Sequence, residues 1–167
     1  MKYKFILFFF LAVFCINCQE RRCFRETNPC VLLKNLQKSF LDKKGNKHYP
    51  PYYGGAYIEN SSLIVIVIGD TLRSKKDLIR RCNGNNFVMH FCHEKQDAIR
   101  KILHHLYIFR KNKENDSIIN ELQFRASYMN SNKRISIELL SFQENRFRNL
   151  VIDSPFLDFE RQILIFE

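Results

Sequence analysis

Apolar residues recur at helical spacing in the segment that follows Asn28. Asn28 is suited to cap a helix, and Pro29 is suited to its first turn, because proline has no N–H group to leave unpaired there. We therefore predict a helix over residues 29–41, followed by a loop over residues 42–51 that is rich in Lys, Gly and Pro. The apolar stripe of this helix consists of Leu32, Leu33, Leu36, Phe40 and Leu41.

The hydrophobic period changes from helix-like to strand-like after residue 51. Residues 53–58 lead into a polar turn at 59–62, and residues 63–68 are an unbroken run of branched apolar side chains. A short apolar run between turns is typical of a buried strand. Ser74 and Asp77 have the spacing of a capping box, which predicts that a helix begins there and ends at residues 83–85. Residues 87–92 then form a further predicted strand.

The longest predicted helix covers residues 94–111, where apolar side chains recur every three or four positions. A charged loop over 111–117 separates it from a strand at 123–129 and an alternating strand at 134–140. Ser141 and Glu144 repeat the capping-box pattern and predict a short helix that reaches Val151 and is closed by Pro155. The last predicted strand begins at 156–159.

The order strand, turn, strand, helix, strand thus occurs twice, about seventy residues apart. The letters echo this order, since residues 56–61 (AYIENS) resemble residues 127–132 (SYMNSN). We predict an α+β fold of two similar small lobes, each an antiparallel sheet with a helix, joined by the long helix. The predicted units are a signal peptide (1–17), a tether (18–28), an N-terminal helix and loop (29–51), a first lobe (52–92), a connecting helix and loop (93–117) and a second lobe (118–167).

The two lobes differ in the polarity of their strands. The strand at 134–140 has one polar face, as expected of a sheet with one side in water. The strand at 63–68 has no polar face, so its sheet needs cover on both sides. Either the chain's own helices supply both covers, or a partner protein docks on one side through Leu63, Val65 and Val67.

The N-terminus has the pattern of an export signal. Lys2 and Lys4 precede an apolar run over residues 5–14, which is too short for a stable membrane-spanning helix. Polar residues begin directly after Cys18, which makes Cys18 the candidate acylated residue of a lipoprotein. The preceding residues 15–17 (CIN) depart from the usual lipobox, so plain secretion remains the alternative. We expect an exported protein, anchored in the cell envelope by lipid or secreted.

Export makes disulfides chemically accessible. With Cys15 removed in the leader and Cys18 lipidated, four cysteines remain, and the candidate pair is Cys23 with Cys30, which closes a short loop. A strand of six residues separates Cys82 from Cys92 by about 20 Å, which is beyond disulfide distance. Free buried thiols are the alternative to any pairing.

The motifs that would identify an enzyme or a cofactor site are missing from the sequence, which has no P-loop, dinucleotide fingerprint or His-Glu-x-x-His. The cluster most suited to chemistry is His90, Cys92, His93 and Glu94, with His104 and His105 on the next helix. Its spacing matches no strong metal motif, and His104 and His105 must face different ways on a helix. We predict no metal, no cofactor and no catalytic residues; a small hydrolase or metal-dependent enzyme that uses the His90/His93 region is the alternative. Ser154, beside Asp153, fits a turn before Pro155 better than a nucleophile.

Composition adds charge to this description. Lys and Arg number 27 against 17 Asp and Glu, a net charge of +10, while 46% of residues are apolar. The basic residues look dispersed along the chain, and nucleic-acid binding would need them on one face with aromatic partners. We therefore expect no nucleic acid as partner, and interpret the charge as a solvated surface or as attraction to an anionic envelope surface.

Three motifs carry a resemblance to a known family. Residues 53–58 (YGGAYI), the strand that ends in Gly69-Asp70-Thr71, and residues 151–155 (VIDSP) resemble the pro-region of secreted bacterial chymotrypsin-like proteases of the α-lytic kind. The resemblance covers about residues 52–160. It implies paired lobes of small sheet plus helix that assist or inhibit a protease.

The rest of such a protease is not recognisable in these 167 residues, which contain no Gly-x-Ser-x-Gly motif. The resemblance therefore implies a non-enzymatic module that binds a protein partner, a protease or an envelope protein, through a sheet surface and the C-terminal tail. In that tail, Ile163 and Ile165 are the candidate contact residues. An inhibitor that acts on a separate protease is a further alternative.

Overall fold

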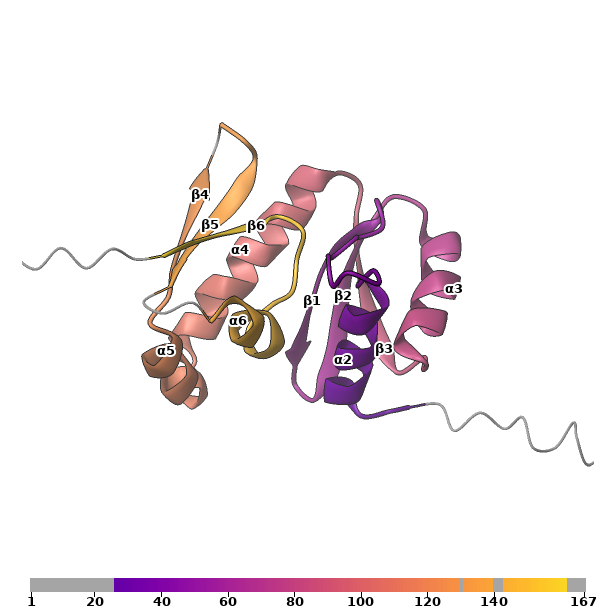
Figure 1. The fold of residues 1–167 in the computed structure, drawn as a ribbon, viewed down its shortest axis with the longest axis horizontal. Coiled ribbons are helices and arrows are strands. Elements are labelled where there is room, and N and C mark those ends of the chain that lie inside the picture. The colour runs from indigo at the N-terminus through magenta and orange to yellow at the C-terminus, as the bar shows by residue number, and fades with distance from the viewer. Residues whose placement is uncertain (1–25, 130, 140–142, 162–167) are drawn as a thin grey trace, which may run out of the picture.

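Two three-stranded sheets lie on opposite sides of one long helix, α4 (Lys95–Lys111) (Figure 1). This computed structural model describes residues 26–129, 131–139 and 143–161. The first lobe contains α2 (Pro29–Ser39), β1 (Tyr53–Glu59), β2 (Ser62–Ile68), α3 (Thr71–Cys82) and β3 (Phe87–Cys92). After α4 follow η1 (Lys113–Asn115), α5 (Asp116–Leu122), β4 (Arg125–Met129), β5 (Arg134–Leu139), α6 (Glu144–Leu150) and β6 (Leu157–Arg161).

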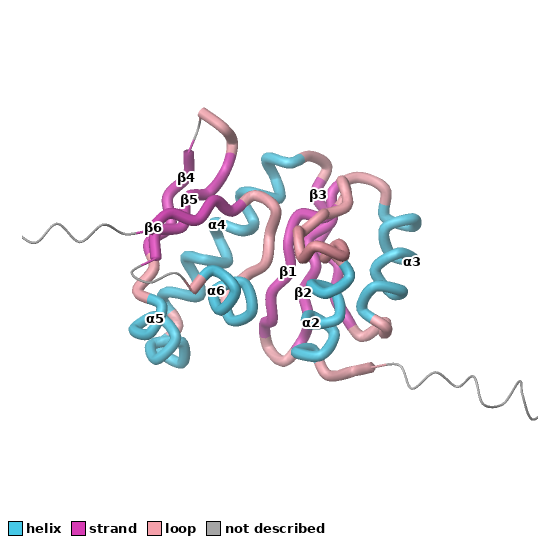
Figure 2. The backbone as a smooth tube through the Cα atoms, viewed as in Figure 1, coloured by secondary structure: helices cyan, strands magenta, loops and turns pink. Residues whose placement is uncertain are grey.

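Both sheets have the same topology, which confirms the predicted α+β repeat. In the first sheet, β1 and β2 form an antiparallel hairpin, and β3 lies beside β2 in the order β1-β2-β3. The second sheet repeats this as β4-β5-β6. Figure 2 shows the strands as these two separate groups. The hairpin turn of the first lobe has positive φ at both Asn60 (47°) and Ser61 (58°), the conformation that matches the twist of tight hairpins.

The third strand of each sheet is parallel to its neighbour, which corrects the expectation of purely antiparallel sheets. β3 pairs with β2 in parallel from Leu63↔Phe87 to Ile68↔Cys92, and β6 pairs with β5 in parallel. The connecting helix accounts for this direction, because it carries the chain from the end of one strand back to the edge of the sheet where that strand began.

The predicted start of α2 is confirmed, but the predicted start of α3 is wrong. Asn28 accepts a hydrogen bond from the Cys30 N–H, and α2 runs to Ser39. The predicted start of α3 is wrong by one turn: Asp70 is the N-cap and accepts from the Leu72 and Arg73 N–H groups. Ser74 is instead buried inside the helix and donates its hydroxyl proton to the Asp70 carbonyl.

The connection after α4 also differs from the prediction. Residues 113–117, predicted to belong to a charged loop, are part of η1 and α5, which continues to Leu122, and β4 begins at Arg125 rather than at the predicted residue 123. Gln123 ends α5 with a left-handed backbone (φ 43°), so the chain turns sharply there. Ser141, the predicted cap of the next helix, lies outside the described residues, and α6 begins at Glu144.

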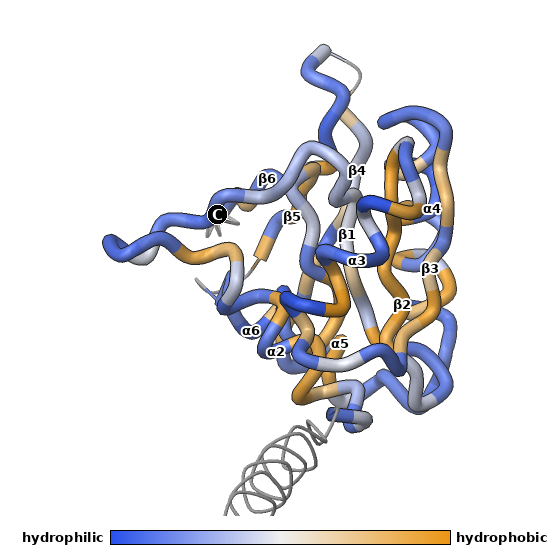
Figure 3. The backbone as a smooth tube through the Cα atoms, turned by 90° about the vertical axis from the view of Figure 1, so that its right-hand side faces the viewer, coloured by the Kyte–Doolittle hydropathy of each residue, from blue (hydrophilic) through white to orange (hydrophobic). Residues whose placement is uncertain are grey.

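The apolar residues form two clusters, separated by the first sheet. One cluster joins α2 and α3 to one face of that sheet and contains Tyr53, Leu63, Val65, Val67 and Leu78 among others. The second cluster is built around α4 and joins the other face of the first sheet to the second lobe. Figure 3 shows β2 and β3 largely in the hydrophobic colour. The prediction that the first sheet needs cover on both faces is confirmed.

The same arrangement decides between the two alternatives for Leu63, Val65 and Val67. All three side chains are completely buried and pack in the cluster beneath α2 and α3. This face of β2 is covered by the chain's own helices, so the expectation that it is a partner surface is wrong.

Several sequence-based predictions lie outside the described residues. They concern the leader (1–17), Cys18, Cys23 and the tail residues Ile163 and Ile165. Among the residues that are described, no helix is both long and apolar enough to cross a bilayer.

Candidate functional site

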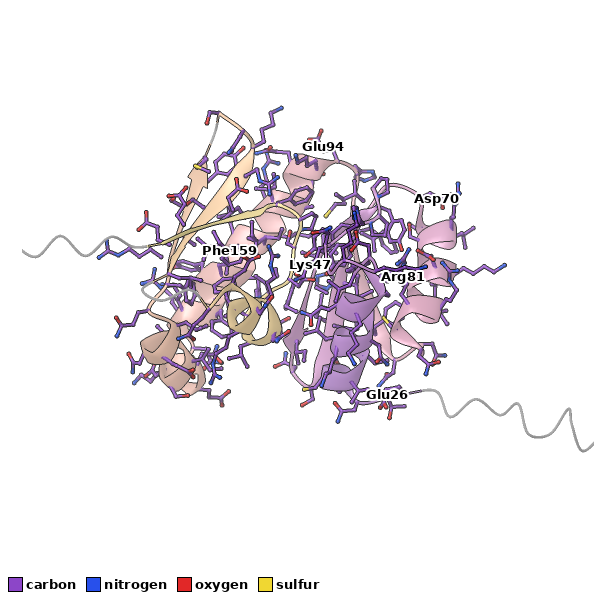
Figure 4. The ribbon with its side chains drawn as sticks, viewed as in Figure 1. Glu26, Lys47, Asp70, Arg81, Glu94 and Phe159 are labelled. Atoms are coloured by element: carbon purple, nitrogen blue, oxygen red, sulfur yellow. The ribbon has the colours of Figure 1, made fainter. Side chains whose placement is uncertain are left out.

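A buried carboxylate, Asp153, lies where the two lobes meet. Its side chain is completely buried, and its Oδ1 accepts hydrogen bonds from Arg148 Nη1 at 3.1 Å and from the Tyr49 hydroxyl at 2.8 Å. Lys47 Nζ adds an ion pair at 3.4 Å, and Figure 4 places Lys47 between the lobes. Lys47 and Tyr49 come from the loop before β1, and Arg148 comes from α6. The cluster therefore ties the N-terminal segment to the second lobe.

The backbone on either side of Asp153 is bound directly to β1. Asp153 and Ala56 exchange two backbone hydrogen bonds of 2.8 and 2.9 Å, and the Ser154 hydroxyl donates to the Gly54 carbonyl at 2.6 Å. Gly55 allows this approach, because a Cβ there would lie 3.1 Å from both the Asp153 carbonyl oxygen and Ser154 Cβ. Two of the three motifs that carry the family resemblance, at 53–58 and 151–155, are thus neighbours in space.

Ser154 has the turn role that the sequence predicts. Its hydroxyl oxygen accepts from the Phe156 N–H at 3.1 Å, two residues on, as serine does when it stabilises a local turn. The side chain is completely buried. Both hydrogen bonds of the hydroxyl are made to the backbone, so Ser154 acts as a connector between the lobes.

Electrostatics in this cluster favour fixed charge states. Burial raises the pKa of both Tyr49 and Tyr53, with a further rise from the Asp153 charge, so both phenols stay protonated at neutral pH. Burial alone lowers the Arg148 pKa, but Tyr49 and Asp153 outweigh it and the net pKa is raised. Arg148 therefore remains charged opposite Asp153. The cluster therefore stabilises the contact between the two lobes rather than taking part in proton transfer.

The histidines that the sequence singles out are only partly brought together. His90 from β3 and the neighbours His104 and His105 from α4 line one depression of about 410 Å³, while His93 lies exposed outside its lining. The prediction that His104 and His105 face different ways is confirmed, since His104 is exposed and His105 is buried. Glu59, Arg100 and Lys101 also line this depression.

His105 has a structural contact on each side. Its ring stacks on Tyr57 with centroids 3.7 Å apart, and its Nε2 lies 3.1 Å from the Val151 carbonyl oxygen. Burial lowers its pKa to about 4, so the ring is neutral at physiological pH. In the described part of the chain, no three His, Cys, Asp or Glu side chains are grouped as a metal site requires.

No disulfide joins the three described cysteines to one another. Cys30 is exposed at the start of α2, whereas Cys82 and Cys92 are buried. Burial raises the pKa of Cys82 to about 12 and also raises that of Cys92. The pairing of Cys30 with Cys23 stays a prediction, because Cys23 lies outside the described residues.

The outer strand β3 exposes apolar side chains that the sequence analysis did not single out. β3 is at the edge of the first sheet, and its Val88 and Phe91 are 46% and 50% exposed. No other described strand pairs with its outer side. An exposed apolar edge is a template for pairing with another chain. The signal was present in the sequence as an apolar run, but only the sheet order shows which strand is at the edge.

The fold is a pair of ββαβ units that pack on a shared helix, α4. A buried ion pair, Arg148 with Asp153, lies where the two units meet. Residues 19–92 match the family model of a Pro-like N-terminal domain. The match includes α2 and the first lobe and stops at the last residue of β3. Residues 19–92 are therefore pro-region-like, which agrees with the resemblance over residues 52–92; the match does not extend to the 151–155 motif or the second lobe. No curated protein and no solved structure matches the chain significantly.

Proposed function

We propose that this chain is an exported, non-enzymatic, pro-region-like module that binds a secreted protease of the chymotrypsin kind. The match over residues 19–92 supports the module, and the protease follows from the resemblance of the 53–58 and 151–155 motifs. The leader pattern over 1–17 supports export, and Cys18 is the proposed site of a lipid anchor.

The observation that carries partner binding is the outer edge of β3. An edge strand has one row of unpaired N–H and C=O groups, and an extended partner segment can add to it as a further strand. Val88 and Phe91 supply exposed apolar contacts on its two faces. The proposed occupant of this edge is therefore an extended segment of the protease.

The alternative, an enzyme that uses the His90/His93 region, receives less support. His90 lies in the depression beside α4, and exposed His93 is outside its lining. Burial and the Lys101 charge lower the pKa of His90, so both effects disfavour its protonation. Nothing in this arrangement orients a nucleophile toward a base.

Partner binding is tested with chymotrypsin as the protease. The full chain is expected to form a complex in gel filtration and to slow peptide cleavage at micromolar excess. Val88→Lys with Phe91→Lys places two charges on the edge and is expected to weaken binding by about tenfold or more. Tyr107→Lys, an exposed aromatic residue on α4, is the matched control. Absence of any complex, or equal loss in the control, would overturn the proposed edge.

The anchor is tested separately in cells. Cys18→Ser is expected to move the chain from the membrane fraction to the soluble exported fraction, because one polar side chain then replaces the acylated residue. Metabolic labelling with a fatty-acid analogue should mark the unchanged chain and not the variant. Membrane retention of an unlabelled Cys18→Ser chain would contradict the lipid anchor.

A further inference from the structure

The basic charge of the described fold is concentrated in two segments. Residues 29–48 contain five Lys and one Asp, and α3 contains five Lys and Arg and one Asp. Residues 83–167 are nearly balanced, with twelve Lys and Arg against eleven Asp and Glu. The net positive charge of the described chain therefore comes mainly from these two segments.

The helices of both segments cover the same face of the first sheet. α2 and α3 pack beside each other over one face of the first sheet, and Figure 1 shows α3 on the side that faces away from the second lobe. Their outward side chains are exposed and basic. We call the exposed cations of α3 the basic face; it consists of Arg73, Lys75, Lys76 and Arg80, whereas Lys34 and Lys38 of α2 line a depression beside Asn145 and Asn149 of α6.

Little of this charge is neutralised within the described chain. Asp77, the acidic residue of α3, already binds Arg80 and Arg81 and accepts the Tyr52 hydroxyl. No described acidic side chain lies within ion-pair distance of Arg73, Lys75 or Lys76. These three cations are available to an external anion.

The basic face also exposes an apolar side chain, Leu72, which is next to Arg73 and is 81% exposed. Basic residues interspersed with exposed aliphatic side chains are typical of surfaces that contact the headgroup region of a bilayer.

The N-terminal segment joins the fold beside this face. The Glu26 N–H donates to the Asn83 carbonyl, 3.3 Å away, just beyond the C-terminal end of α3. Gly84 packs so closely on the backbone at Glu26 that a Cβ on Gly84 would lie 2.4 Å from the Glu26 carbonyl oxygen. Cys18 is eight residues before Glu26, so the connecting chain spans at most about 28 Å.

We propose that the basic face binds the surface of an anionic lipid bilayer and so sets the orientation of the module on the membrane. This inference rests on the proposed anchor at Cys18, which would hold α3 within the reach of the headgroups. Phosphate groups of the lipid would pair with Arg73, Lys75 and Lys76, and Leu72 would enter the headgroup region. The β3 edge and the second lobe would remain accessible to a protein partner.

The test compares binding of the full chain to two kinds of vesicle. One contains only phosphatidylcholine, and in the other about a third of the lipid is phosphatidylglycerol. The measured quantity is the ratio of the two partition coefficients, in which the apolar contribution of the leader cancels. The test variant changes Arg73, Lys75 and Lys76 to Glu. The control changes Lys113, Arg125 and Lys133, exposed residues beyond α4, to Glu and alters net charge equally.

The unchanged chain is expected to prefer anionic vesicles, and the α3 variant should lose about a hundredfold in that preference. The control should change it less than about threefold, and raised salt should abolish it. Equal binding to both vesicles, or equal loss in both variants, overturns the inference. In that case an acidic protein becomes the alternative occupant. The Cys18→Ser fractionation tests the lipid anchor independently of the vesicle experiment. A failure of the anchor can therefore be told apart from a failure of lipid binding by the basic face.

Discussion

Arg148 and Asp153 form an ion pair that is almost completely buried at the junction of the lobes, with Nη1 3.1 Å from Oδ1. The same guanidinium donates to the Ser154 carbonyl at 2.9 Å and binds Glu144 at 2.8 Å. A buried carboxylate of this kind is tolerated only while its cation is present. The pair is therefore a requirement of the assembled fold.

Removing the cation should destabilise the protein strongly. Arg148→Met is expected to lower the free energy of unfolding by about 3 kcal/mol, because Asp153 would keep its burial and lose its closest charge. Urea denaturation at pH 7 measures this change. Arg146→Met is the matched control: Arg146 is exposed and pairs with exposed Glu121, so it should cost less than about 1 kcal/mol. Similar losses for both variants would contradict the role of the buried pair.

Buried His105 should make stability fall in mild acid. The unfolded chain gains a proton at His105 near pH 6.5, but the folded chain gains it only near pH 4, since burial lowers the folded pKa. The unfolded state thus binds more protons between these values, and stability decreases as the pH falls from 7 to 4.5. The shift corresponds to about 3 kcal/mol over the whole window.

The variant His105→Phe keeps the aromatic stack on Tyr57 and should remove most of this pH dependence. Urea unfolding at pH 7, 5.5 and 4.5 measures it, and exposed His104→Phe is the control, which should keep the slope. The carboxyls of Asp42 and Asp77, whose pKa values are lowered to about 2, contribute only when the pH falls below their ordinary value of 3.8. A pH slope unchanged in His105→Phe would exclude His105 as its source.

The thiols should divide into two groups by reactivity. Buried Cys82 and Cys92 have raised pKa values and should be alkylated at pH 8 only after denaturation. Exposed Cys30 should react in the folded chain after reduction, and should be blocked before reduction if it is paired with Cys23. Mass spectrometry of the alkylated peptides distinguishes these states. Rapid alkylation of Cys30 without reductant would argue against the predicted disulfide.

Metal content separates the module from its enzymatic alternative. Because the histidines of the depression include buried His105, whose Nε2 faces a backbone carbonyl, we expect less than about 0.1 equivalent of zinc in the purified chain. Elemental analysis measures this for the unchanged chain and for His90→Ala. One equivalent of zinc that disappears in His90→Ala would instead favour a metal-dependent enzyme.

Local sequence patterns predicted most of the fold. The apolar run at 63–68 correctly implied a strand covered on both sides, and Asn28 correctly marked the start of α2. The start of α3 was predicted wrongly because Ser74 and Asp77 have the spacing of a capping box. In the structure Ser74 instead lies one turn before Leu78 on the buried side of α3. α5 was missed because its seven residues are too few to show a helical period clearly.

The buried cluster at the lobe junction could not be predicted in the same way. Tyr49 and Asp153 are 104 residues apart in the chain, and neither belongs to a helix or strand whose period would reveal its direction. Only the packing of α6 and the loop before β1 brings them together. The burial of Leu63, Val65 and Val67 could not be predicted for a similar reason, because the unbroken apolar run of β2 reveals neither which elements cover it nor that β3 is the edge of the sheet.

The matched family domain ends at Cys92 and contains all three strands of the first sheet, but not the helix that covers one face of that sheet. Tyr57, Ile64 and Ile66 point to the side that α4 covers, and α4 begins only at Lys95. A domain cut at Cys92 would expose these side chains to water and would have to recruit an apolar helix from elsewhere. In this chain α4 covers that surface, and because α4 also packs against the second lobe, we expect the two lobes to unfold together.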